Sequence, residues 1–140
     1  MVVLDVNLLL AAFLDGHPMH AKARAWLIDL LDTNQVVVPD VVWAGLARIA
    51  TNPRIVNPPA TWVDVASFIV EVRAERACQV ETRAMTSPLE VFLAICQSGN
   101  ATGNKVSDAY IAAIAMENGA SIATWDADFK AFPVQLATLP

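Results

Sequence analysis

Short β-branched runs alternate with longer segments of helical spacing along this chain. Runs with the length and composition of strands occur at 1–5 (MVVLD) and 35–39 (QVVVP), and weaker ones at 78–82, 120–124 and 133–138. Between them, apolar residues recur at helical spacing in the segments 20–31, 41–49, 62–72, 88–96 and 108–118. This alternation predicts an α/β fold with a central parallel β-sheet of about four to five strands, flanked by helices on both faces.

Length and composition limit the alternatives. The chain has 140 residues, of which 56% are hydrophobic and 16% charged, which fits one folded domain spanning 1–140 and excludes a disordered chain. The apolar run at 8–14 (LLLAAFL) is far shorter than the ~18 residues of a membrane span, and Asp5 interrupts the opening segment where a signal peptide would be apolar. The two cysteines, Cys78 and Cys96, suit a reducing compartment. We therefore expect a cytoplasmic protein with no membrane partner.

Acidic residues gather near two of the predicted strands. Asp5 closes the first strand, and Asp126 and Asp128 follow the strand at 120–124. Asp108 begins the helix that leads into the strand at 120–124. In an open parallel sheet, ligands bind at the carboxyl ends of the strands. We therefore expect these four acids to meet at one edge of the sheet.

Carboxylates that share one crevice repel each other unless a cation lies among them. Mg²⁺ and Mn²⁺ suit such a site, because they are hard ions that prefer oxygen ligands. They activate water and neutralise charge on a phosphodiester. The net charge of −5 argues against a broad basic surface for nucleic acid, but a bound cation would reverse the local field. The acids thus point to metal-dependent phosphodiester hydrolysis.

Each acid also has a purely structural interpretation. Asn7 could cap a helix after the first strand, with Asp5 at the strand exit. Asp108 could cap its own helix, and Asp126 and Asp128 a short turn. Capping does not require the acids to converge, so their positions in the fold distinguish the two interpretations.

Several stretches of the sequence resemble motifs of a known family. These stretches are VVLDVNLLL at 2–10, HPMHAKARAWL at 17–27, LARIATNPRI at 46–55 and GNKVSDAYIAAIAMENGASIATWDADF at 103–129. They resemble PIN-domain proteins and, more narrowly, the VapC toxins of bacterial toxin–antitoxin pairs. The resemblance spans essentially the whole chain. It implies a metal-dependent endoribonuclease that uses Mg²⁺ or Mn²⁺ and leaves 5′-phosphate and 3′-hydroxyl ends.

The resemblance also implies roles for particular residues. Asp5, Asp108 and Asp126 match the catalytic, metal-binding acids of the family, and Asp128 matches a frequent auxiliary acid. The polar and basic positions that the resemblance marks as supporting the acids or the RNA are Asn7, Arg48 and Thr124. Among partners, it implies an RNA substrate, a homodimer, and a VapB-type antitoxin that covers the acidic crevice with a basic side chain.

One position departs from the family pattern. The second family acid usually lies three residues before the basic residue, where this chain has Gly45. Glycine offers no ligand atom and costs about 1 kcal/mol relative to alanine inside a helix. Asp40 is a poor replacement, because five residues correspond to about 140° around a helix. Gly45 therefore leaves an alternative open: a catalytically impaired PIN scaffold that binds an antitoxin or RNA.

Other classes of protein fit the sequence less well. A phospho-accepting receiver needs adjacent acids early in the chain and a lysine after its last strand, whereas Asp5 stands alone and no lysine follows Lys130. No GxG or GxSxG motif supports dinucleotide binding or a serine hydrolase. Trp125, inside the last acidic motif, is a candidate for stacking on an RNA base.

Overall fold

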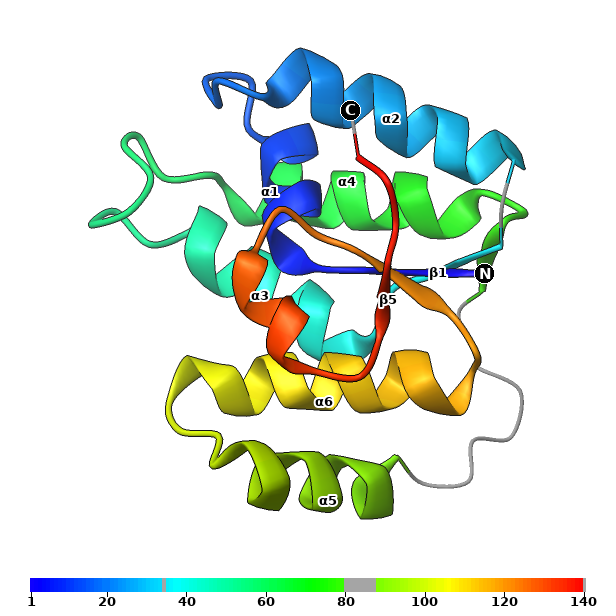
Figure 1. Ribbon diagram of the computed structural model, residues 1–140. Helices are drawn as coiled ribbons and strands as arrows, with labels where there is room; N and C mark the ends of the chain where they lie inside the picture. Colours follow the sequence, from blue (N-terminus) through cyan, green and yellow to red (C-terminus); the bar gives the residue numbers. More distant parts are fainter. Residues whose placement is uncertain (34, 80–87, 140) are drawn as a thin grey trace.

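The computed structural model describes residues 1–33, 35–79 and 88–139 (Figure 1). Its strands are β1 (Val2–Leu4), β2 (Val36–Val37), β3 (Cys78–Gln79), β4 (Ser121–Ala123) and β5 (Gln135–Leu136). Its helices are α1 (Val6–Phe13), α2 (His20–Thr33), α3 (Asp40–Ala50), α4 (Trp62–Ala74), α5 (Leu89–Gly99), α6 (Asn104–Glu117) and the short 3₁₀ helix η1 (Ala127–Ala131). The expected alternation of strands and helices is confirmed.

Within the described residues, five strands form one sheet in the order β3-β2-β1-β4-β5, and every pair is parallel. The central strand, β1, is buried along its whole length, which explains its continuous apolar sequence. The chain builds the sheet outward from β1 in one direction, through β2 and β3, and then returns to add β4 on the other side of β1. The β1–β4 boundary is therefore the switch point where a ligand crevice forms.

Helices cover both faces of the sheet, as predicted. Figure 1 shows α5 and α6 on one side of β1, and α1, α2 and α4 on the other. The fully buried side chains that fill the core include Val3, Leu4, Leu8, Leu46, Ile122 and Phe129. They come from the central strands and from the helices that pack on them, so the carboxyl ends of β1 and β4 rest on a rigid support.

Helix α1 lies outside the segments in which the spacing of apolar residues predicts a helix. Leu8, Leu9, Ala11 and Ala12 are all buried, so this segment shows no polar face that would reveal a helical period. The helix begins directly after β1, and Asp5 is its N-cap. The alternative interpretation, in which Asn7 caps a helix after the first strand, is therefore wrong in the choice of capping residue.

Helix α6 begins four residues earlier than expected, at Asn104 instead of Asp108. Its N-cap is Gly103, which adopts a φ of 57° and a ψ of −127°, a conformation with positive φ that glycine tolerates. Asp108 thus lies in the second turn of the helix and does not cap it. The helix ends close to the predicted end at 118, with Asn118 as its C-cap and Gly119 at a φ of 58°.

One predicted element lies partly outside the described residues. It is the expected strand at 78–82, of which the structure describes Cys78–Gln79 as β3. Among the described residues, no helix is long and apolar enough to cross a bilayer.

Candidate active site

The carboxylate of Asp5 stands at the carboxyl end of the central strand. In the register of β1 with β4, Leu4 pairs with Ala123, so Asp5 and Thr124 are the next residues along each strand. The Asp5 side chain is only 4% exposed. Its Oδ1 accepts a hydrogen bond from the Val6 amide at 2.6 Å, and its Oδ2 accepts one from the Thr124 hydroxyl at 2.7 Å. The backbone register and these two bonds fix the carboxylate in one orientation.

Thr124 links three parts of this edge through its hydroxyl. Besides donating to Asp5, Thr124 Oγ1 accepts hydrogen bonds from Asn7 Nδ2 and from the Asp126 amide, each at 2.9 Å. The Asn7 carbonyl oxygen in turn accepts a long bond of 3.5 Å from the Trp125 amide. Asn7 and Thr124 therefore belong to one hydrogen-bond network with Asp5 and the backbone of the turn at Asp126.

Asp126 and Asp128 lie on the turn after β4. Asp126 caps η1, because its Oδ1 accepts a hydrogen bond from the Asp128 amide at 2.8 Å. Both residues are exposed. Asp126 both caps η1 and lies near Asp5, so its capping role does not exclude a role in the site.

The pKa values show that the acids act on one another. Burial raises the pKa of Asp5, and the charge of Asp126 raises it further, while hydrogen bonds from Thr124 and Val6 oppose the shift. Burial also raises the pKa of Asp108, from 3.8 to about 6. The negative charges that add to this rise are those of Asp5, Asp126 and Asp128, against the opposing charge of Lys105. The structure thus brings the four acids into one electrostatic cluster.

A pocket of about 240 Å³ joins the two most perturbed acids to helix α3. Asp5 and Asp108 line it together with Gly45 and Arg48. The family's missing acidic position, Gly45, therefore faces the same pocket as the acids that remain. Sequence reasoning missed the other lining residues, such as Ser107 and the apolar side chains of α1, α3 and α6, because no local signal marks which helix faces meet.

The donor set of this edge fits a hard divalent cation. Carboxylate oxygens are the ligands that Mg²⁺ and Mn²⁺ prefer. A bound cation would offset the cost of burying the negative charges of Asp5 and Asp108 and the repulsion by their acidic neighbours, which together raise their pKa values. In residues 1–33, 35–79 and 88–139, no three His, Cys, Asp or Glu side chains are already gathered at metal-binding spacing. A cation bound here would have to bring some of these carboxylates closer together.

An α/β domain with acids clustered at the switch point of a parallel sheet is the architecture of a PIN domain. The PIN domain family matches residues 2–134. Ribonuclease VapC25 of Mycobacterium tuberculosis is 34% identical over 133 residues, which cover 94% of this chain and 93% of that protein. Ribonuclease VapC33 of the same organism is 28% identical over 133 residues, which cover 94% of this chain and 92% of that protein. The chain belongs to the VapC ribonucleases of the PIN-domain family.

Solved structures show the same fold. VapBC2 from Rickettsia felis, bound to a DNA fragment from its promoter, matches with a TM-score of 0.68 and 20% identity over 100% of both chains. FitAcB from Neisseria gonorrhoeae matches with a TM-score of 0.64 and 19% identity, covering 99% of this chain and 97% of that one. The resemblance drawn from the sequence motifs is confirmed.

Proposed function

We propose that this chain is the toxin of a toxin–antitoxin pair, an endoribonuclease that requires Mg²⁺ or Mn²⁺ and is neutralised by a VapB-type antitoxin. The observation that carries the proposal is the electrostatic cluster of Asp5, Asp108 and Asp126 at the carboxyl edge of the sheet. The relatives that match this chain over nearly their whole length are named VapC ribonucleases, which supports the same activity in this chain.

The residues at the carboxyl edge of the sheet would have different roles in the reaction. Asp5, Asp108 and Asp126 would hold the cation, with Asp128 as an auxiliary ligand. The cation would supply charge neutralisation at the phosphate and activation of water for attack. Thr124 and Asn7 keep Asp5 oriented, so the carboxylate need not reorganise when RNA binds. Attack of water on the phosphorus would break the bond between the phosphorus and the 3′ oxygen, which leaves 5′-phosphate and 3′-hydroxyl ends.

The partners follow from the same site. The VapBC2 neighbour carries a toxin–antitoxin name, and a crevice lined by Asp5 and Asp108 would attract a basic side chain of an antitoxin. We also expect a homodimer. We also infer a cytoplasmic location, which an RNA substrate and the free thiols of Cys78 and Cys96 support.

The alternative of a silent scaffold rests on Gly45 alone. The loss of one acid removes one ligand, but the remaining acids still act on one another. The named activity of the relatives favours the enzyme. Gly45 is therefore better explained as a modification of the site than as its inactivation.

Incubation of the antitoxin-free protein with total RNA tests the proposal. Cleavage in Mg²⁺ or Mn²⁺ should disappear with a chelator and fall by at least about tenfold in Asp126→Asn, which removes an exposed carboxylate from the cluster. The matched control is Asp29→Asn, an exposed acid on α2. End mapping should find 5′-phosphates. Cleavage that persists in chelator, or an Asp126→Asn variant as active as the control, would contradict the proposal.

A further inference from the structure

Lys105 lies in the first turn of α6, three residues before Asp108. Residues at this spacing are neighbours on the surface of a helix, so Lys105 and Asp108 lie on the same side of α6. Lys105 is exposed, whereas Asp108 is half-buried. The helix thus carries a cation on the solvent side of one of the clustered acids.

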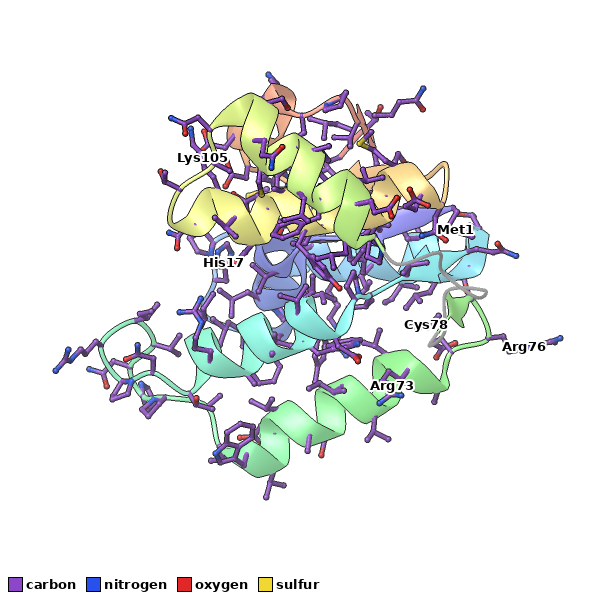
Figure 2. All side chains as sticks on the ribbon, turned by 90° about the horizontal axis from the view of Figure 1, so that it is seen from below. Met1, His17, Arg73, Arg76, Cys78 and Lys105 are labelled. Atoms are coloured by element: carbon purple, nitrogen blue, oxygen red, sulfur yellow. The ribbon has the colours of Figure 1, made fainter. Side chains whose placement is uncertain are left out.

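The start of α6 lies at the edge of the sheet that carries the acids. Met1 precedes β1 and Cys78 begins β3, so both residues mark the amino ends of parallel strands. Figure 2 shows Lys105 at the end of the molecule opposite Met1 and Cys78. Lys105 therefore lies toward the carboxyl ends of the strands, where Asp5 follows β1.

The charge of Lys105 reaches the acid cluster. Of the charges in the described part of the chain that act on Asp5 and Asp108, only that of Lys105 is positive, and it opposes the rise in the pKa of Asp108. Lys105 nevertheless forms no ion pair with any described carboxylate. Its ammonium group is therefore near the cluster and remains available to an anion from outside the chain.

An RNA strand that approaches this edge meets an excess of negative charge. A divalent ion would offset two of the negative charges of the four clustered acids, and the edge would still repel the phosphates. The chain as a whole carries −5 and offers no general attraction. A cation at the rim of the cluster reduces this repulsion where the strand must pass.

We propose that Lys105 binds the RNA phosphate next to the scissile one and so holds the strand across the acids. This inference rests on the ribonuclease function proposed above. The scissile phosphate belongs at the cation held by Asp5 and Asp108. Three residues of helix separate Lys105 from Asp108 by about 4.5 Å along α6, and the flexible stem of lysine adds further reach. The ammonium group can therefore meet the strand beside the cation site, outside it.

Substitution of Lys105 should change substrate affinity more than the chemical step. Lys105→Gln should raise the KM for RNA by about 3- to 10-fold and leave kcat within about twofold, while Lys105→Arg, which keeps the charge, should leave both within about twofold. The control is Arg76→Gln, which removes an exposed positive charge near Cys78, at the opposite end of the molecule (Figure 2). It should behave as the wild type, and all variants should unfold at the same temperature.

Metal and RNA binding separate this role from an indirect effect through Asp108. Lys105→Gln should bind Mn²⁺ as tightly as the wild type or up to about threefold more tightly, because a repelling cation is removed. Its affinity for a labelled single-stranded RNA in Ca²⁺ should fall, and the slope of log affinity against log salt should shrink by about 0.7, the value for one lost phosphate contact. A loss of Mn²⁺ affinity with unchanged RNA affinity would show that Lys105 acts through Asp108 and would overturn the inference.

Neutral phosphates in the substrate locate the contact. In an RNA oligonucleotide with a mapped cleavage site, a methylphosphonate at a phosphate adjacent to the scissile one should raise the KM of the wild type by about 3- to 10-fold. The same change should raise the KM of Lys105→Gln by less than about twofold, because the contact is already lost. Equal effects on both proteins at the phosphates on either side would contradict the proposed contact.

The outcomes distinguish this inference from the function on which it rests. A wild type that cleaves RNA while Lys105→Gln matches it in KM and in salt slope would overturn the role of Lys105 alone. A wild type that cleaves no RNA would overturn the ribonuclease function, and the salt slope of RNA binding would still decide the role of Lys105. A wild type that neither cleaves nor binds RNA would overturn both.

Discussion

Replacing Asp108 by Asn should stabilise the metal-free protein at neutral pH. The pKa of Asp108 is about 6 in the folded chain, against an ordinary value of 3.8. A carboxyl whose folded pKa is raised contributes stability below pH 3.8 and loses it as the pH rises through 6. At pH 7.5 the wild type therefore carries the cost of a charged Asp108 that is partly buried and lies among other acids, and Asn removes that cost.

The size of the effect follows from the same values. One pKa unit corresponds to about 1.4 kcal/mol, so the rise from 3.8 to about 6 sets an upper bound of about 3 kcal/mol. The carboxyl is partly exposed and its charge is screened by solvent, which reduces the gain to about 1–2 kcal/mol. For a domain of this size, that gain corresponds to a rise in Tm of roughly 3–8 °C.

Thermal unfolding in chelator at several pH values measures this effect. The gain of Asp108→Asn over the wild type should be largest at pH 7.5 and fall to about a third by pH 4.5, where the folded wild type is already protonated. Mn²⁺ should shrink the gain or reverse it, because the wild type alone gains full binding energy. Asp29→Asn, on the exposed face of α2, should show no such dependence. A Tm difference that does not change with pH would refute the electrostatic cluster around Asp108.

Three further predictions concern the neighbouring residues and the assembly. Thr124→Val should lower the free energy of unfolding by about 2–4 kcal/mol, because it removes a buried hydroxyl with three hydrogen bonds. Thr124→Ser should lower it by less than about 1 kcal/mol. Equal losses of the two variants in denaturant titrations would argue against the hydrogen-bond network of Thr124. Gly45→Glu should raise Mn²⁺ affinity and the cleavage rate at limiting metal, because it adds a carboxylate to the pocket of Asp5 and Asp108; an unchanged rate would mean that position 45 is not a missing ligand. Light scattering on the antitoxin-free protein should give twice the mass of the 15.1 kDa chain, and a monomer at micromolar concentration would exclude the expected homodimer.

Much of the site could be predicted from the sequence, because topology alone places the ends of parallel strands together. Asp5 follows a buried central strand and Thr124 closes another, and their side chains are hydrogen-bonded in the structure. The motif resemblance added Asn7, whose amide completes the same network. These residues are close in space because the register of β1 with β4 brings them side by side.

Other features could not be predicted, because they depend on contacts between distant segments. Helix α1 is buried on so much of its surface that it shows no amphipathic period, so its helical state follows from packing and not from local pattern. Asp108 lies in the second turn of α6 because the helix begins at Asn104, after a Gly103 with positive φ that no sequence rule requires. The pocket that Gly45 and Arg48 share with the acids forms only where α1, α3 and α6 meet.

Calorimetric titration with Mn²⁺ tests most directly whether the separated acids hold one ion between them. The wild type should bind Mn²⁺ saturably, and Asp5→Asn, Asp108→Asn and Asp126→Asn should each weaken the affinity by at least about tenfold, a loss of about 1.4 kcal/mol. Asp29→Asn should bind as the wild type does. If all three variants bind Mn²⁺ as tightly as the wild type, or if the wild type does not bind it, the acids do not form a common metal site.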